Sequence, residues 1–216
     1  MRSMAILELL AALLVVASPA GAADPGPETT RSLARSDLRV IVRSAGYVEA
    51  LRAQASERRE LQPIVRPLAG DLWVVCVIDL PNQINMLTDR DIEKLGLSQD
   101  EAIALARRNV AVELPPGSAV ITPLTPRNAI GNITGHFYEA SRLLMHEDWA
   151  ALSREMNGRL VVAVPLPETV LYIEGTDRAD LDALARVAEA TAKGDRRRIS
   201  TQLFRWVADG WEVVAP

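Results

Sequence analysis

The sequence predicts an α+β fold in which helices pack on a mainly antiparallel sheet. Three pairs of strand-like segments lie near residues 64–79, 160–174 and 199–214, and a short turn joins the two members of each pair. Helix start and stop signals lie between these pairs. The chain has 216 residues, of which 49% are hydrophobic, so it is long enough to bury a substantial core. We therefore expect one domain over residues 31–216, or two similar subdomains that meet near residues 125–158.

The overall composition excludes several classes of protein. Charged residues make up 24% of the chain and the formal net charge is −4, which excludes a disordered acidic or basic tail. This slightly acidic balance argues against a nucleic-acid partner. The single cysteine excludes an intramolecular disulfide bond.

The N-terminus has the pattern of a secretory signal peptide. Arg2 supplies a positive charge, residues 9–17 form an apolar run, and Ala20-Gly21-Ala22 matches an A-x-A cleavage site. The run is shorter than the about 20 apolar residues that span a bilayer. We therefore expect a signal peptide at residues 1–22, a flexible linker at residues 23–30, and a secreted or periplasmic protein without stable membrane insertion. An uncleaved N-terminal anchor is the alternative.

The first folded segment has a spacing that predicts a helix. Leu38, Ile41 and Ala45 fall at positions i, i+3 and i+7, with arginines on the opposite side. The next segment, residues 47–60, is compatible with either a helix or an irregular strand.

Residues 64–79 predict a hairpin whose second strand is buried. Gly70 lies in the turn, and residues 72–78 are apolar at every position, which is typical of a strand covered on both faces. Cys76 lies within this run, where burial raises the pKa of a thiol, so we expect it to have a packing role.

Two helices follow, and each has a capping signal. Thr88 precedes a first turn that contains two aspartates, and Gly96 is a C-terminal stop. Ser98 and Glu101 form a capping box that begins the second helix. After this helix, residues 119–124 are expected to form a short strand.

The last part of the chain has the most regular pattern. Residues 137–157 predict a helix with a break near Met145. Residues 160–174 predict a buried strand and its hairpin partner. Asp177 begins a further helix, and residues 199–214 form the last hairpin.

Several of these segments resemble the YtpQ-type family of uncharacterised bacterial proteins. The resemblance is carried by residues 71–79 (DLWVVCVID), 87–98 (LTDRDIEKLGLS), 138–141 (YEAS) and 160–165 (LVVAVP). It covers roughly residues 60–207 and implies an α+β fold with no established activity, so it assigns no catalytic residues. Pro167-Glu168 stands where the family tends to carry Arg-Asp, so any role of that arginine is absent here.

The sequence contains no familiar catalytic motif. A G-x-S-x-G elbow, a Walker loop, a dinucleotide-binding glycine motif and an H-E-x-x-H motif are all missing. His136 and His146 are the only histidines, and in one helix they would lie about 15 Å apart, too far for one metal ion. We therefore expect neither a metal ion nor a cofactor.

Individual polar side chains are the candidates for a site. Asp79 follows the buried strand at its carboxyl end, where open sheets often present ligands, although a turn-capping role is favoured. We expect Tyr138 to pack its ring against the sheet and Ser141 to contact a helix neighbour. The candidate catalytic residues of an enzyme are Asp79, His136 and Glu139, and the candidate binding residues are Asp79, Asn85, Tyr138 and Ser141.

The leading functional hypothesis is an exported, non-catalytic protein that binds an unknown small molecule or an envelope protein. The alternative is a cell-envelope hydrolase with a carboxylate and histidine site. Convergence of Asp79, His136 and Glu139 in one concave pocket would favour the hydrolase, whereas their dispersal would favour the binding protein.

Overall fold

The computed structural model describes residues 32–55, 61–122, 124, 126, 129–175, 177–208 and 210–214, with Ser118 described by its backbone alone. The expected signal peptide and linker, residues 1–22 and 23–30, lie outside the described residues. Leu33–Pro216 form one compact unit. None of the helices in the described ranges has the length and apolar character needed to cross a membrane.

The secondary-structure elements follow one another along the chain in a mixed order. They are η2 (Arg35–Asp37), β1 (Leu38–Ser44), α1 (Ala45–Ala55), β2 (Val65–Ala69), β3 (Leu72–Leu80), β4 (Gln83–Met86), α2 (Asp89–Leu95), α3 (Gln99–Glu113), α4 (Gly117–Val120), β5 (Gly131–Thr134), η4 (Glu139–Leu144), α5 (His146–Glu155), β6 (Leu160–Leu166), β7 (Thr169–Glu174), α6 (Arg178–Ala192), β8 (Leu203–Val207) and β9 (Gly210–Val213).

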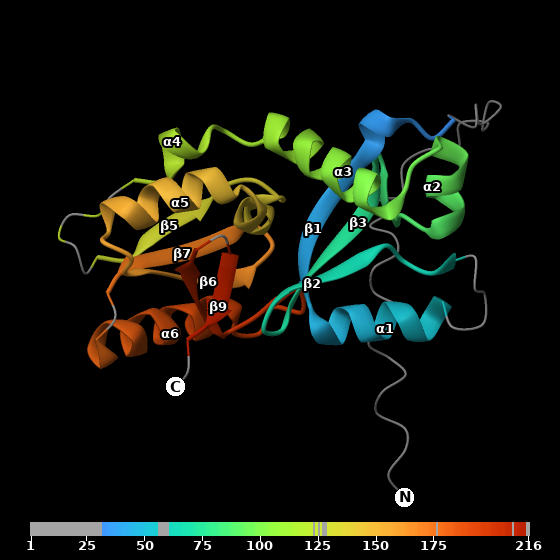
Figure 1. Cartoon of the computed structure of the whole chain (residues 1–216). Helices are drawn as coiled ribbons and strands as arrows, with labels where there is room; N and C mark the ends of the chain where they lie inside the picture. Colours follow the sequence, from blue (N-terminus) through green and yellow to red (C-terminus); the bar gives the residue numbers. More distant parts are fainter. Residues whose placement is uncertain are drawn as a thin grey trace, which may run out of the picture. The chain divides into compact units, whose positions relative to one another are not determined.

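Two antiparallel sheets organise the compact unit (Figure 1). The first sheet has the order β1-β3-β2, with β4 also paired to β3, and the second has the order β5-β7-β6-β8-β9. The three predicted hairpins are β2–β3, β6–β7 and β8–β9. The predicted α+β fold with helices packed on antiparallel sheet is therefore confirmed.

The segment expected to be the first helix is a strand. β1 pairs with β3 along its whole length. Leu38, Ile41 and Ala45 satisfy a helical spacing, but Leu38, Val40 and Val42 satisfy a period of two and are fully buried. The β-branched residues of this run and the pairing with a buried strand decide in favour of β structure. Of the next segment, residues 47–55 lie in α1, so the helical alternative holds there, and residues 56–60 lie outside the described residues.

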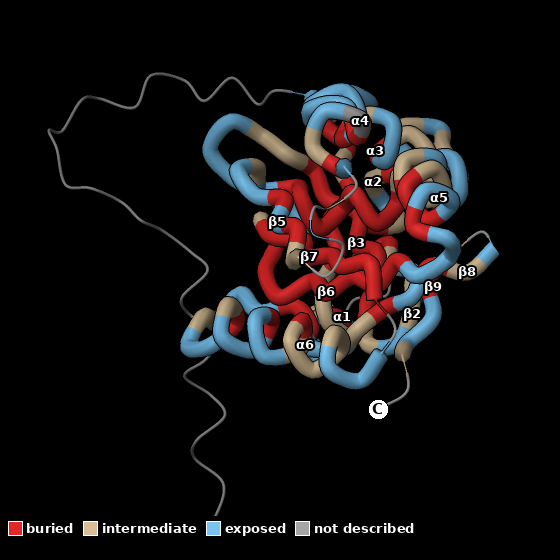
Figure 2. The backbone as a smooth tube through the Cα atoms, turned by 90° about the vertical axis from the view of Figure 1, so that its left-hand side faces the viewer, coloured by how far each residue is buried: buried red, intermediate tan, exposed pale blue. Residues whose placement is uncertain are grey.

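The second sheet is covered on both faces, which explains the apolar runs of its central strands. Val162 of β6 packs in a core with Trp149 of α5, whereas the neighbouring Val161 packs in a core with Leu184 of α6. Figure 1 shows α5 and α6 on opposite sides of this sheet, and Figure 2 shows the buried path of β6 and β7 between exposed turns of helix. A strand between two helical layers has no face for polar residues.

The helices begin where the capping signals predict. Thr88 precedes α2, and Gly96 ends that helix with a φ of 61° in the left-handed region, which glycine adopts without strain. Ser98 and Glu101 form the capping box of α3, and the Asp177 side chain caps α6.

The prediction of a short strand at residues 119–124 is wrong. Gly117–Val120 form the helical turn α4. The Thr122 backbone N–H donates to the Tyr172 hydroxyl, which in turn donates to the Thr122 carbonyl. These side-chain bonds replace a strand partner, and β5 pairs with β7 instead.

We predict that the Cys76 thiol does not react in the folded protein. Its side chain is fully buried in β3, and this burial raises the pKa of Cys76 to about 12, so almost no thiolate is present at pH 8. A thiol-reactive disulfide reagent at pH 8 should label the native protein negligibly while it labels the protein in guanidinium chloride to completion. Native labelling as fast as that of the unfolded chain would contradict the burial.

Candidate functional site

Most of the candidate polar residues gather around one short helical segment. The predicted helix over residues 137–157 is present as η4 and α5, with the expected break at Met145. Every residue of η4 is buried. Since buried polar side chains need hydrogen-bond partners, the partners of these side chains define what the segment does.

Tyr138 precedes η4 and binds Asp79 of β3. Its hydroxyl donates to the Asp79 carboxylate at 2.5 Å, a charge-assisted hydrogen bond. Burial, followed by this hydrogen bond, raises the pKa of Tyr138 above its ordinary value, so the phenol is held protonated. The structure gives Asp79 this partner, and the bond ties the end of β3 to the start of η4.

His136 contacts the same tyrosine. Its Nδ1 accepts the Tyr138 backbone N–H at 3.2 Å, and the two ring centroids are 5.6 Å apart. The structure therefore brings Asp79, His136 and Tyr138 together, although 57 or more residues separate Asp79 from the other two in sequence. In this arrangement Nδ1 holds the turn that leads into η4.

The remaining candidates have other partners. The Glu139 carboxylate forms a buried ion pair with Arg142. The Ser141 hydroxyl donates to the Val40 carbonyl of β1 at 2.9 Å, which corrects the expected contact with a helix neighbour. Asn85 is exposed on β4, a strand that the sequence did not predict. Glu139 and Ser141 thus share η4 but bind different partners, and Asn85 lies on a separate element.

Arg142 is the residue that the sequence analysis missed. Its side chain is only 1% exposed. Its Nε donates to Glu139 and its Nη1 donates to the Pro115 carbonyl at 2.8 Å, but its Nη2 is buried without a hydrogen-bond partner. The i, i+3 spacing of Glu139 and Arg142 in a segment predicted to be helical is the signal that could have identified the pair.

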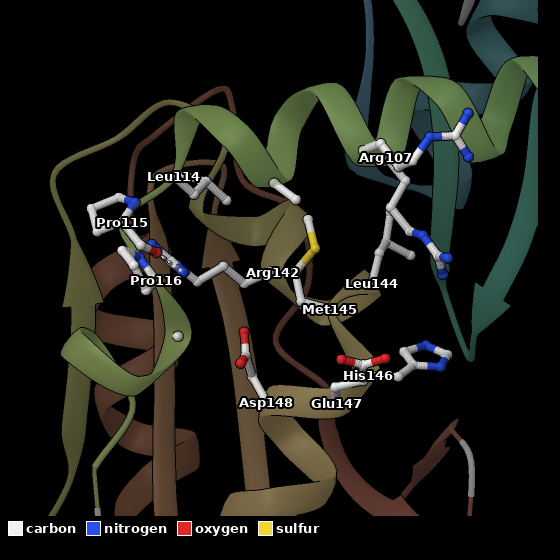
Figure 3. Close-up of a pocket in the computed structure, with 13 residues that line it drawn as sticks. Arg107, Leu114, Pro115, Pro116, Arg142, Leu144, Met145, His146, Glu147 and Asp148 are labelled. Carbon is white, nitrogen blue, oxygen red and sulfur yellow. Dashed lines mark hydrogen bonds between the residues drawn. The ribbon is translucent and has the colours of Figure 1, made fainter.

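Arg142 also lines a pocket of about 540 Å³, a volume suited to a small organic ligand (Figure 3). One wall comes from residues 107–117, at the end of α3 and the turn after it, and the other from residues 142–148, where η4 meets α5. Asp79, His136 and Glu139 do not line this pocket.

Charged side chains of both signs line the pocket. Arg107, Arg108 and Arg142 supply cations, and Glu147 and Asp148 supply carboxylates. Figure 3 shows the Arg142 side chain extending toward Pro115 and Pro116, with Asp148 on the same side of the pocket. A Cβ atom on Gly117 would overlap the Asp148 carboxylate, so glycine allows this carboxylate to pack against the backbone of α4.

The two histidines have separate surroundings. The His146 ring lies 5.3 Å from the Trp206 ring, whereas His136 contacts Tyr138. Within the part of the chain that the structure describes, no group of three or more His, Cys, Asp or Glu residues could hold a metal ion.

Comparisons of the chain with models of protein families, with curated proteins and with solved structures found no match. The resemblance to the YtpQ-type family therefore stays a prediction from the sequence.

We predict that Asp79 and Tyr138 are energetically coupled. Asp79→Ala leaves a buried hydroxyl without its acceptor, and Tyr138→Phe removes the donor, so each should lower the free energy of unfolding by about 1–3 kcal/mol. The double variant should cost about 1–2 kcal/mol less than the sum of the single variants, as measured by chemical denaturation. Asp79→Asn is the matched control, because its amide oxygen still accepts from the hydroxyl, and it should be close to wild type. Strict additivity of the two single effects would contradict the contact.

Proposed function

We propose that this protein is a non-catalytic binding protein whose ligand occupies the pocket between α3 and the η4–α5 junction. The observation that carries the proposal is the separation of this pocket from the candidate catalytic side chains. Asp79 binds Tyr138, Glu139 pairs with Arg142, and His136 accepts a backbone N–H. A general acid or base must lie within hydrogen-bond reach of its substrate, so a hydrolase built on these three residues receives less support.

The lining of the pocket supports ligand binding. Leu114, Leu144 and Met145 supply apolar surface, while the arginines and carboxylates supply a small number of polar groups. This combination is typical of small-molecule sites, in which apolar contacts provide affinity and a few polar groups fix orientation. This lining supports a small molecule as the ligand rather than an envelope protein.

We also propose that the protein acts outside the cytoplasm, in a secreted or periplasmic location. The support is the positive charge, apolar run and A-x-A site within residues 1–22. Cleavage after Ala22 would leave the pocket residues intact, since all of them lie far beyond this position.

We predict that small organic fragments bind at this pocket. A library of anionic, neutral and cationic fragments, screened by NMR against ¹⁵N-labelled protein, should shift amide signals at the end of α3 and the start of α5. Ala111→Trp should abolish these shifts, because Ala111 lines the pocket and an indole there would occupy its volume. Val112→Trp is the matched control: Val112 is the next residue of α3, is 87% exposed and does not line the pocket.

Two results would contradict the proposed function. One is fragment binding that Ala111→Trp leaves unchanged, which would place the site elsewhere. The other is turnover of bound ester or amide fragments by the wild-type protein, which would favour the hydrolase.

We predict that the mature chain begins at Ala23. N-terminal sequencing of protein recovered from the envelope or medium of an expressing bacterium should find Ala23 first, because the A-x-A site ends at Ala22. An Ala20→Arg variant should accumulate uncleaved, since signal peptidase requires a small residue at this position. An intact Met1 on a membrane-retained wild-type product would favour the uncleaved anchor.

A further inference from the structure

We propose that the ligand of the pocket carries an oxyanion, a carboxylate or phosphate group, that accepts a hydrogen bond from Nη2 of Arg142. This inference rests on the proposed binding function and names the chemical class of the ligand. It starts from an unusual feature of the interior: the buried guanidinium of Arg142 has hydrogen-bond acceptors for Nε and Nη1 but none for Nη2.

The unpartnered nitrogen belongs to a side chain that the fold holds in place. Nε is fixed by Glu139, and Nη1 is fixed by the Pro115 carbonyl, so the guanidinium plane cannot turn to find another acceptor without losing one of these bonds. Nη2 is also buried, so it has no contact with bulk solvent in this arrangement. A ligand oxygen that reaches Nη2 would therefore form a hydrogen bond without displacing an existing one.

The pocket lies beside the side chain that carries this nitrogen. Arg142 and Met145 both line it, and Figure 3 shows the two side chains next to each other. Nη2 itself is buried, so a shift of the lining side chains, of which Met145 is flexible and unbranched, has to expose it to a ligand in the cavity. Arg142 thus lines the cavity already, and a local movement of side chains would bring its Nη2 within reach of an oxyanion there.

Two further arginines make the entrance favourable for an anion. Arg107 and Arg108 line the same pocket from α3, and both are exposed. Exposed cations around a cavity raise the local concentration of anions and accelerate their binding. Arginine in particular forms paired hydrogen bonds with carboxylate and phosphate oxygens.

The carboxylates of the pocket offset the charge of its arginines. Asp148 packs against Gly117, and Glu147 is exposed. When Glu139, the partner of Arg142, is counted, three carboxylates balance the three arginines, so the attraction for an oxyanion is local to Nη2 and the exposed arginines and does not come from net charge. The expected ligand is therefore a small molecule with a carboxylate or phosphate group that enters the pocket.

The experiment compares charged and neutral probes of the same shape at constant ionic strength. Succinate, its neutral diamide succinamide, and inorganic phosphate are titrated into ¹⁵N-labelled full-chain protein, and amide shifts at the end of α3 and the start of α5 are followed. We expect succinate or phosphate to bind at this site at least about tenfold more tightly than succinamide. Tighter binding of succinate than of phosphate would indicate a carboxylate ligand, and tighter binding of phosphate would indicate a phosphate ligand.

Variants then test which arginines are responsible. Arg142→Lys keeps a cation beside Glu139 but lacks the planar fork, and it should weaken anion binding by more than about tenfold. If this variant fails to fold, the decision rests on Arg107→Gln/Arg108→Gln, which alters exposed residues and should weaken binding by about 3- to 10-fold. Arg90→Gln is the matched control: Arg90 is an exposed arginine of α2 that does not line the pocket.

The outcomes separate this inference from the proposed function. Equal binding of succinate and succinamide at the pocket would overturn the oxyanion while the binding function stands. Binding of library fragments at the pocket without any binding of succinate or phosphate would do the same. Equal weakening by Arg90→Gln would also overturn it, because the anions would then respond to general surface charge. If no library fragment binds at the pocket, both the oxyanion inference and the proposed binding function are overturned.

Discussion

The buried ion pair between Glu139 and Arg142 is the interaction on which the arrangement around η4 depends. Both side chains are almost completely buried, so their transfer from water carries a large desolvation cost. Their mutual attraction and the hydrogen bond from Nη1 to the Pro115 carbonyl offset this cost. Loss of one partner would leave an uncompensated charge in the interior, at a cost of about 3–5 kcal/mol. The backbone around the pair is therefore strongly constrained.

That constrained backbone connects elements from both sheets. The Arg142 carbonyl accepts the indole N–H of Trp149 from α5, and the Leu143 carbonyl accepts the indole N–H of Trp211 from β9. On the side of the first sheet, Ser141 bonds to β1. The hydrophobic cores supply most of the driving force, but apolar contact is non-directional. Directional polar contacts at η4 are what select one register between the neighbouring elements.

The sequence predicted the fold best where one pattern excluded the others. The buried strands β3, β6 and β7 were found because a run without polar residues between turn signals has few alternatives. β1 was missed because Leu38 and Ile41 fit a helical period as well as an extended one, and the pairing with β3 that decides between them is a long-range contact. For the site, Asp79 and Tyr138 were identified singly, but no local signal shows that residues so far apart in sequence meet. The pocket was missed for the same reason, since its two walls come from separate segments.

The position of Arg142 has a consequence for how ligand binding and folding are related. Two of its nitrogens serve the fold and a third faces no protein acceptor. A ligand that binds this third nitrogen would bind only the folded chain, because the unfolded chain does not assemble the site. Such a ligand stabilises the folded state by mass action, in proportion to the logarithm of its concentration above Kd. Because η4 also holds β1, α5 and β9, this stabilisation would extend to both sheets rather than remain local to the pocket.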